Sequence, residues 1–411
     1  MLKKNQQFLL FIFLSVIVLS CGTRKLKTHD FPNVKHTFNK PISYQDKKIY
    51  VIDTSFFADN MFDAARLNAF EKVNDSTLQV TILPENEPIN ESPHYAFRIW
   101  SSIEKDINLK LNYPTSSHRY WPKISSDGKN WIPIDSANFK LVDSNKNAIL
   151  QLQLTNKKIW ISAQEIHNSS DAKNWSKSVA NHQNVRYSVI GKSKLNRDLI
   201  GLDVYEGDPK GKEMIVILSR QHPPEVTGYL AMQAFVKELL GESRLAKDFR
   251  SKYRTLIFPM LNPDGVDLGH WRHNSGGIDL NRDWAYYRQD EVKTIVNYIV
   301  DTSNKDRNKV VLGLDFHSTQ EDLYYTFPDD VHSSIYPFKD YWLGAIDAAI
   351  PAYTPDDRPY AVGDPISKGW FYLQFNAESV TYEIGDETPR AFIKLKAQIA
   401  AREMMKLLIL K

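Results

Sequence analysis

Residues 214–225 read MIVILSRQHPPE, and this stretch decides the fold of the larger part of the chain. Residues 214–218 form a short, continuous apolar run that is typical of a buried strand, and a helical pattern follows over 226–240. Pro223 and Pro224 cannot continue a central strand, but they suit the entry to a helix. The stretch therefore predicts a buried strand, a tight loop and a helix, the repeating unit of α/β folds.

The same alternation continues to the end of the chain. Apolar strand-like runs lie at 255–260, 310–316 and 379–384, and helical stretches at 291–300 and 390–410. Buried strands that alternate with helices predict a largely parallel or mixed sheet covered on both faces. We therefore expect an α/β domain over residues 184–411.

Residues 41–168 have a different pattern. Short runs such as AILQLQL at 148–154 alternate apolar and polar residues, and turn signals such as Ser126-Asp127-Gly128-Lys129 separate some of them. A β-sandwich is the natural prediction, with one short helix near 61–72. The polar residues 168–184 are interpreted as the connection between the two domains, or as a surface loop of one of them.

The N-terminal segment has the features of a secretion signal. Lys3 and Lys4 precede an apolar run over 8–19, which is shorter than the ~20 residues that a membrane span needs. Cys21, the only cysteine, follows directly, and the segment resembles a bacterial lipoprotein signal in which that cysteine is lipidated. We expect a lipoprotein signal over 1–21 and a polar, basic tether over 22–40; an ordinary signal peptide is the alternative. The expected location is the bacterial cell envelope, facing the periplasm or the outside.

Composition excludes several classes of protein. Hydrophobic residues make up 42% of the 411 residues and charged residues 25%, which is the balance of a globular protein and not of a disordered or multi-spanning one. The formal net charge is only +3, which gives no reason to expect nucleic-acid binding. A single cysteine excludes a disulfide framework and a cysteine-based metal site.

Two predicted strand ends carry residues that bind zinc. His222 and Glu225 follow the strand at 214–218, and His317 follows the strand at 310–316. Side chains that bind ligands in α/β sheets gather at the carboxyl ends of the strands. Two imidazoles and a carboxylate match the three protein ligands of a catalytic zinc site with an open fourth position. Each residue alone is more often structural, so the combination carries the prediction of one Zn²⁺.

Further motifs occur in a fixed order between and around these ligands. They are His222-Pro223-Pro224-Glu225, Asn262-Pro263-Asp264-Gly265, Trp271-Arg272, Asp279-Leu280-Asn281-Arg282, His317-Ser318 and Glu383. The ordered set resembles the zinc carboxypeptidase family, the carboxypeptidase A-like group. Within the family, the sequences of residues 260–266 and 277–282 and the preceding β domain make the chain most similar to the cytosolic carboxypeptidase-type subgroup. The resemblance implies an α/β fold with a mixed, eight-stranded sheet flanked by helices and preceded by a β-sandwich.

The resemblance also implies roles around the metal. His222, Glu225 and His317 are the zinc ligands, and Asp279 is the carboxylate behind the first histidine, where it orients the imidazole. Glu383 matches the general base, which takes a proton from the attacking water.

The resemblance places substrate-binding residues nearby. Arg272 matches the arginine that stabilises the oxyanion. Asn281 and Arg282 match the pair that binds the terminal carboxylate, for which a guanidinium fork is suited. Tyr360 matches the mobile tyrosine that covers bound substrate. Lys368 lies about where the family sets specificity, and a cation there would favour an acidic terminal residue.

We therefore predict a zinc-dependent metallocarboxypeptidase that hydrolyses the C-terminal peptide bond of peptides. One alternative is a carboxypeptidase or amidase of peptidoglycan stem peptides, which an envelope lipoprotein would meet. Another is an aspartoacylase-type zinc amidohydrolase, against which the 262–265 and 271–272 motifs argue. A binding protein with a decayed site is disfavoured because every ligand and the base are present. The expected partners are a peptide or peptidoglycan-derived substrate and a membrane reached only through the lipid anchor.

Overall fold

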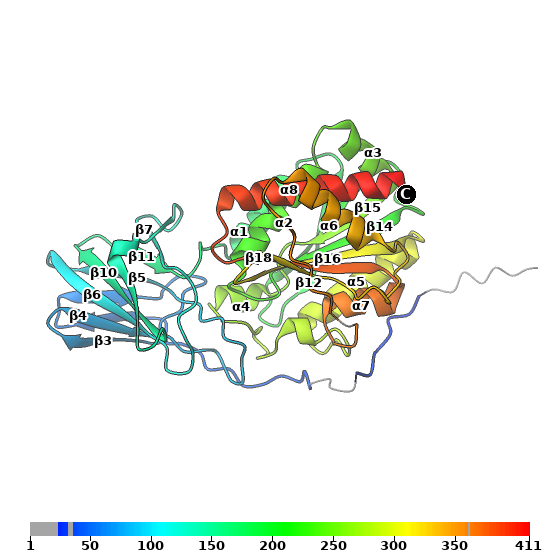
Figure 1. Ribbon diagram of the computed structural model, residues 1–411. Coiled ribbons are helices and arrows are strands. Elements are labelled where there is room, and N and C mark those ends of the chain that lie inside the picture. Colours follow the sequence, from blue (N-terminus) through cyan, green and yellow to red (C-terminus); the bar gives the residue numbers. More distant parts are fainter. Residues whose placement is uncertain (1–23, 32–35, 361) are drawn as a thin grey trace, which may run out of the picture.

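The computed structural model describes residues 24–31, 36–360 and 362–411. They form a β-rich part and an α/β part that lie side by side (Figure 1). Cys21 and the expected signal segment 1–21 lie outside the described residues. Among the described residues, no helix combines the length and the apolar character needed to cross a membrane.

In the N-terminal part, the described residues form two sheets that face each other. The strands are β1 (Ile49–Ile52), β2 (Phe56–Asp59), β3 (Ala69–Asn74), β4 (Thr77–Thr81), β5 (Ala96–Ser101), β6 (Lys105–Asn112), β7 (Lys123–Ser125), β8 (Ile132–Pro133), β9 (Phe139–Val142), β10 (Asn147–Leu154) and β11 (Ile159–Ser162), with a 3₁₀ turn, η1, at Ser136–Asn138. One sheet has the order β1-β2-β5-β11-β7-β8 and the other β3-β4-β6-β10-β9. Alternation places Ile107, Leu109 and Leu111 of β6 in the core, where they meet Phe97 and Ile161 of the facing sheet. This part is the expected β-sandwich.

The helix expected near residues 61–72 does not form. Ala64 has a left-handed backbone with φ of 68°, Arg66 forms a bridge with Ala96, and the strand β3 begins at Ala69. Pairing with neighbouring strands satisfies the backbone groups that a helix would have satisfied internally. The prediction was wrong because strand pairing within the sandwich outweighs the local pattern.

The α/β part is built on one mixed sheet with the order β12-β13-β15-β14-β16-β18-β17 in the described residues. Its elements are α1 (Ser169–Val179), β12 (Val185–Lys192), β13 (Asp198–Val204), β14 (Glu213–Ser219), α2 (Val226–Leu239), α3 (Arg244–Lys252), β15 (Tyr253–Phe258), α4 (Pro263–Asp267), the 3₁₀ turn η2 (Leu280–Arg282), α5 (Asp290–Lys305), β16 (Lys309–Thr319), β17 (Leu323–Tyr325), α6 (Phe338–Ala349), α7 (Ser367–Phe375), β18 (Glu378–Gly385) and α8 (Arg390–Leu410). Strands β15, β14, β16 and β18 run parallel to one another. The antiparallel strands β12, β13 and β17 lie at the two sides of this parallel centre.

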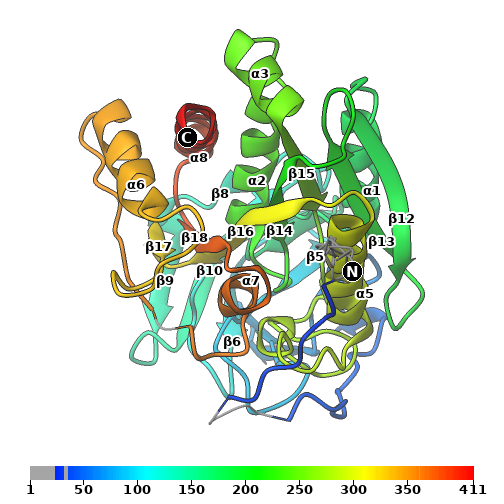
Figure 2. The same ribbon diagram turned by 90° about the vertical axis from the view of Figure 1, so that its right-hand side faces the viewer.

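Helices cover both faces of this sheet. In β14, Ile215 and Ile217 join the core formed with α2 and α8, whereas Met214, Val216 and Leu218 join the core formed with α5 and α7. Figure 2 shows α2, α3, α6 and α8 on one face and α5 and α7 on the other. The continuous apolar run of the sequence is therefore explained by burial of β14 on both sides.

The described sheet has seven strands where the resemblance implied eight. Beside β17, the place of a further strand is taken by a single bridge between Tyr324 and Asp357. Tyr324 donates to the Asp356 carbonyl (2.8 Å) and its own carbonyl accepts from Arg358 N (2.8 Å); just beyond, Tyr360 N donates to the Thr326 carbonyl (3.0 Å). The edge of the sheet thus ends in an irregular segment that leads to Tyr360.

The polar stretch 168–184, expected as a connection or a loop, contains helix α1. Asn168 and Asp171 form a reciprocal capping box at its start. Ser169 donates to Asp267 through both its backbone nitrogen (2.9 Å) and its hydroxyl (2.6 Å), which fixes α1 to the end of α4. The cap residues that made the stretch look like a loop are therefore the start signal of a helix.

The described residues of the expected tether, 24–31 and 36–40, lie along the α/β part, and we call them the strap (Figure 1). Arg24 donates to a backbone carbonyl that follows α5 (2.9 Å). Thr37 is buried, and its carbonyl accepts from Gln289 Nε2 (2.8 Å). These residues of the expected tether are therefore held along the α/β part, which satisfies their polar groups.

Candidate active site

The residues predicted to bind zinc come together at the carboxyl ends of neighbouring strands. His222 and Glu225 lie in the loop between β14 and α2, and His317 lies near the end of β16. Their ligand atoms all lie within 4.8 Å of one another. Within the described ranges, no other cluster of three or more His, Cys, Asp or Glu side chains meets that condition. The parallel order of β14 and β16 explains the meeting, because both strands end at the same edge.

Glu225 lies between the two imidazoles. Its Oε1 is 2.7 Å from His222 Nδ1, and its Oε2 is 2.7 Å from His317 Nδ1. A further carboxylate lies behind each ring: Asp279 Oδ1 is 2.8 Å from His222 Nε2, and Asp315 Oδ2 is 2.9 Å from His317 Nε2. These outer carboxylates hold both rings so that the Nδ1 atoms face one point.

This donor set fits a zinc ion. Two imidazoles and one carboxylate are the ligands of many catalytic zinc sites, and a carboxylate behind each imidazole makes it a better ligand. A zinc ion held there supplies Lewis acidity, which polarises a carbonyl and lowers the pKa of water. Asp279 was expected behind His222, whereas Asp315 was missed. Asp315 lies two residues before His317 and so on the same face of β16, which is the sequence signal that points to it.

Glu383 lies beside His317, since the two residues are paired in the register of β16 and β18. Burial raises the pKa of Glu383 to about 7, and the nearby Glu225 acts in the same direction while His317 opposes it. Burial also acts to raise the pKa of Glu225, but His222 and His317 outweigh it and hold that pKa well below its usual range. One carboxylate therefore stays ionised, as a ligand must, and the other can exchange a proton near neutral pH.

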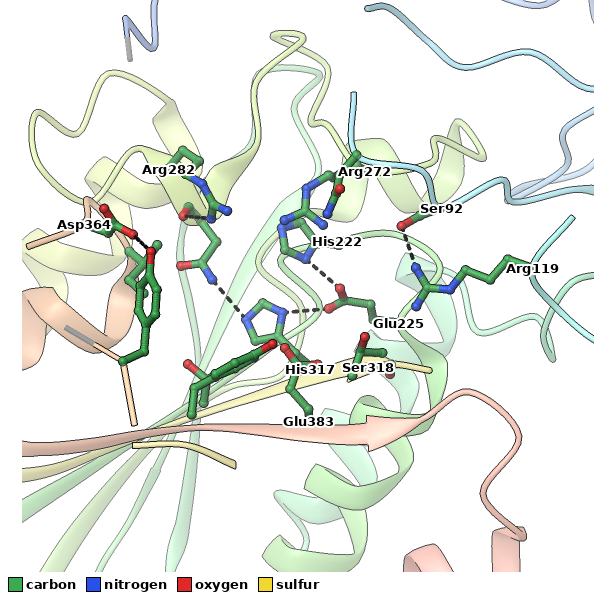
Figure 3. Close-up of a pocket in the computed structure, with 17 residues that line it drawn as sticks. Ser92, Arg119, His222, Glu225, Arg272, Arg282, His317, Ser318, Asp364 and Glu383 are labelled. Atoms are coloured by element: carbon green, nitrogen blue, oxygen red, sulfur yellow. Dashed lines mark hydrogen bonds and ion pairs between the residues drawn. The ribbon is translucent and has the colours of Figure 1, made fainter. Parts of the chain in front are cut away.

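Arg272 lies in the cleft next to His222 (Figure 3). Its Nε donates to Asp279 Oδ2 at 2.7 Å, so the carboxylate that orients His222 also orients this guanidinium. Burial opposes ionisation, but Asp279 and nearby carboxylates raise the pKa of Arg272. A fixed cation at this point can stabilise negative charge that develops on a substrate oxygen.

The loop that carries Arg272 is held by a residue of the β-sandwich. Glu85, in the β4–β5 loop, is fully buried. Its carboxylate accepts hydrogen bonds from the backbone nitrogens of Trp271 (2.8 Å), Arg272 (3.1 Å) and His273 (2.7 Å). No local pattern points to Glu85, which precedes Trp271 by 186 residues. Only the packing of the two domains brings them together.

Asn281 and Arg282 lie on η2 and line the same cleft. Asn281 Oδ1 accepts from the backbone nitrogen of Ser367 (2.9 Å), and its Nδ2 lies 3.4 Å from His317 Nε2. The Arg282 side chain is 43% exposed; its Nη1 donates to the carbonyl of Asn281 (2.8 Å) and forms a long ion pair with Asp279 Oδ2 (3.9 Å). The structure therefore leaves the guanidinium of Arg282 facing the cleft.

Tyr360 also lines the cleft, and its hydroxyl donates to Asp364. Lys368 does not line the cleft. It is fully buried in α7, where its Nζ donates to the carbonyls of Thr326 (2.7 Å) and Tyr360 (2.6 Å). The prediction that Lys368 contacts a terminal side chain is wrong, because the start of α7 turns this residue behind Tyr360 and into the protein.

The β-sandwich contributes directly to the cleft. Asn90 and Ser92 of the β4–β5 loop and Arg119 of the β6–β7 loop line it together with the residues of the α/β part. Figure 3 shows Arg282 and Asp364 on one side of the histidines, and Ser92 and Arg119 on the opposite side. Asn90, Ser92 and Arg119 lie outside the catalytic motifs, and no local sequence pattern indicates that they line the cleft.

Comparisons with known proteins agree with this geometry. A family model described as zinc carboxypeptidase matches residues 173–403. Cytosolic carboxypeptidase 6 of Caenorhabditis elegans is 30% identical over 141 residues, which are 33% of this chain and 30% of the relative. Cytosolic carboxypeptidase 2 of Danio rerio is 36% identical over 110 residues, which are 26% of this chain and 15% of the relative. The matches thus span about a third or less of these relatives.

Solved structures share the fold over a longer stretch. A metallo-carboxypeptidase from Burkholderia cenocepacia aligns with a TM-score of 0.71 at 16% identity and covers 86% of this chain and 98% of its own. A metallo-carboxypeptidase from Pseudomonas aeruginosa, in complex with (2-guanidinoethylmercapto)succinic acid, aligns with a TM-score of 0.69 at 16% identity, over 85% and 98%. The shared fold therefore extends beyond the α/β part into the β-rich part.

The chain belongs to the zinc carboxypeptidase family, because the family model covers more than half of it. It is homologous to the cytosolic carboxypeptidases over the matched stretch. Members of this family use one zinc ion, and His222, Glu225 and His317 form the group that could hold it here.

Proposed function

We propose that this protein is a zinc-dependent carboxypeptidase that removes the C-terminal residue of peptides. One observation carries the proposal: Arg282 and Asn281 line one cleft with the complete ligand group and Glu383. An enzyme that cleaves only the last peptide bond needs a cation at a fixed distance from the reacting centre, and the partly exposed guanidinium of Arg282 provides it.

The residues divide the reaction among them. Arg282 and Asn281 bind the terminal carboxylate and so place the last peptide bond beside the ligand group. Glu383 takes a proton from the attacking water, and the same carboxyl returns it to the nitrogen of the leaving amino acid. Arg272 stabilises the negative charge that develops on the carbonyl oxygen. Tyr360 lies at the rim, where its ring can cover the bound terminal residue.

A preference for acidic terminal residues is a separate and finer hypothesis. It was inferred from Lys368, which is buried away from the cleft. The described cations that do line the cleft are Arg119, Arg272 and Arg282, and the last two have the roles given above. Asp364 lies beside Tyr360 and would oppose an acidic side chain. We therefore do not extend the proposal to acidic terminal residues.

Peptidoglycan stem peptides remain the second candidate class of substrate, since they also end in a free carboxylate that Arg282 can bind. The test is hydrolysis by the purified, zinc-loaded protein of three sets: peptides with free C-termini, the same peptides amidated, and stem peptides. We expect release of single residues from free C-termini and none from the amides. Equal cleavage of the amides would contradict the proposal, and cleavage of stem peptides alone would move the substrate class to the cell wall.

We also propose that the chain is a lipoprotein of the bacterial cell envelope. The support is the sequence of residues 1–21, with Cys21 directly after the apolar run. In cells fed a labelled fatty acid, the wild-type chain should carry the label and sediment with membranes, and Cys21→Ser should do neither. A wild-type chain without label would contradict this proposal. Protease treatment of intact cells distinguishes a surface location from a periplasmic one.

A further inference from the structure

Arg119 lies where no catalytic motif would place a residue. It belongs to the β6–β7 loop of the sandwich and lines the cleft on the side of the histidines opposite Arg282 (Figure 3). If Arg282 binds the terminal carboxylate, the rest of the substrate chain must leave the ligand group in the direction of Arg119. Residues upstream of the cleaved bond therefore pass along the side of the cleft that Arg119 lines.

The guanidinium of Arg119 is held rigidly. Its Nε donates to Asp386 Oδ2 at 2.8 Å, and its Nη1 donates to Ser92 Oγ at 3.0 Å and to the Glu91 carbonyl at 3.4 Å. Burial acts to lower the pKa of Arg119, but Tyr120 and Asp386 outweigh it, so the group is a permanent cation. Its Nη2 has no hydrogen-bond partner in the parts of the chain that the structure describes. A pre-ordered cation with a free donor loses little entropy when it binds an oxygen.

We propose that Arg119 binds an acceptor oxygen of the substrate chain upstream of the cleaved bond, so that the β-sandwich forms half of the substrate site. The inference rests on the proposed carboxypeptidase function and extends it from the terminal residue to those before it. The oxygen belongs either to a backbone carbonyl or to an acidic side chain. Both accept a charge-assisted hydrogen bond from a guanidinium.

An interdomain ion pair is the competing explanation, since Asp386 directly follows β18 in the α/β part. The ion pair with Asp386 is made by Nε of Arg119, and Nη1 donates to Ser92 and to the Glu91 carbonyl within the sandwich. The ion pair does not account for the position of this arginine in the lining of the cleft, with Nη2 unpaired among the described residues. Arg98 provides the comparison. It also pairs with a buried carboxylate, Asp59, at 2.6 Å, but it lies outside the cleft.

The test compares Arg119→Gln with wild type on substrates of increasing length that share one terminal residue. The shortest is an N-acyl amino acid, which has no carbonyl upstream of the one that is attacked. The longer ones are tri- and pentapeptides with Ala or Glu before the cleaved bond. We expect KM for the peptides to rise about tenfold, as for a lost hydrogen bond to a charged group, while kcat/KM for the N-acyl amino acid stays within about twofold.

The outcomes separate cleanly. If KM rises for the longer substrates whether Ala or Glu precedes the cleaved bond, Arg119 binds a backbone carbonyl. If KM rises only for the peptides with Glu, Arg119 binds the acidic side chain. Both outcomes support the proposal. An equal loss on all substrates, or no loss, overturns it. Arg119→Lys, which keeps the charge near Asp386, should recover part of the peptide KM, and Arg98→Gln should leave the length dependence unchanged. The proposed function fails separately, if wild type cleaves none of these substrates.

Discussion

Glu383 differs from the other carboxylates around the ligand group in its hydrogen bonding. Asp279, Asp315 and Glu225 each contact a histidine at 2.7–2.9 Å, whereas the buried Oε2 of Glu383 has no hydrogen-bond partner in the described parts of the chain. A carboxylate in such surroundings is available to a water or a substrate proton. Its raised pKa follows from the same burial.

Glu383→Gln should therefore remove catalysis and leave the site intact. The amide fills the same volume but cannot accept a proton, so we expect kcat to fall about 10²–10⁴-fold with zinc content unchanged. Steady-state kinetics and metal analysis of the same samples measure the two quantities. Glu71→Gln, at an exposed position of β3, is the matched control and should leave kcat unchanged. Full activity of Glu383→Gln would remove Glu383 from the mechanism.

Lys368 was predicted to contact the substrate, but the structure gives it a structural role, because it is fully buried in α7. Burial lowers the pKa of Lys368 to about 7, although Glu378, Asp364 and Asp357 oppose the change. In the unfolded chain its pKa is about 10.4. Between these values the unfolded chain holds the proton more tightly, so the contribution of Lys368 to stability rises with pH.

Lys368→Met should therefore remove a pH dependence and not a selectivity. From about pH 7 to 9, the free energy of unfolding of the wild type should rise relative to the variant by on the order of 1 kcal/mol per pH unit. Urea unfolding at each pH measures this difference. The ratio of kcat/KM for peptides ending in Glu and in Leu should stay within about twofold; a large change in that ratio would return Lys368 to the substrate site.

At the scale of elements, the order of strands explains why distant motifs meet. His222, His317 and Glu383 come from segments at the same edge of β14, β16 and β18. The Asn262-Pro263-Asp264-Gly265 motif supports that edge. Asn262 caps α4 and donates from Nδ2 to the carbonyl of Gln221 (3.1 Å), next to the first zinc ligand. The motif therefore acts by holding the ligand loop.

Glu85 is a positioning residue on a loop of the other domain. We expect Glu85→Gln to lower kcat about tenfold, because an amide in place of the carboxylate weakens the hydrogen bonds that hold the Arg272 backbone. A double-mutant cycle distinguishes positioning from general loss of structure. In an Arg272→Ala background, Glu85→Gln should cost little further kcat, although it still lowers the melting temperature.

The same factor of loss in both backgrounds would mean that Glu85 acts on the fold alone. Glu85→Asp is the conservative variant and should recover part of the loss, since it keeps the charge beside the buried Arg66. Removal of the charge leaves Arg66 uncompensated, which is why stability is measured beside activity.

At the scale of the whole molecule, the two domains share one active site. Ion pairs join them at Arg119–Asp386 (2.8 Å), Lys123–Glu387 (3.0 Å) and Arg390–Glu165 (2.8 Å). All three pairs lie just after β18 or at the start of α8, close to the strand that carries Glu383. The sandwich is therefore fixed to the segment that directly follows the strand carrying Glu383.

Zinc should stabilise the entire chain, because its ligands connect the central strands of the sheet. Removal by a chelator should abolish hydrolysis and lower the melting temperature, and added zinc should restore both. At free zinc about 1,000-fold above Kd, the expected stabilisation is about 4 kcal/mol. Thermal unfolding and hydrolysis of one peptide, followed through removal and return of zinc, measure the effect. Activity that survives complete removal of zinc would exclude a metal-dependent reaction.

The sequence by itself determined the class of fold and the His-Glu-His group that could hold a zinc ion. The apolar run at 214–218 and the ligands that follow it are local patterns. Each can be recognised from a short window of sequence, whatever the rest of the chain contains. The order of the motifs along the chain indicates the family independently of their geometry. The capping pair Asn168 and Asp171 is equally local, but the same residue types also favour loops, so the local pattern does not distinguish a helix start from a loop.

Only the tertiary structure decided what the other parts of the chain do. It brought Glu85 and Arg119 of the sandwich to the cleft, laid the strap along the α/β part and buried Lys368. Each of these depends on contacts between residues far apart in the chain, and a side chain carries no local mark of what will pack against it. Short-range patterns specify elements, whereas the packing of two domains specifies which charged groups share one site.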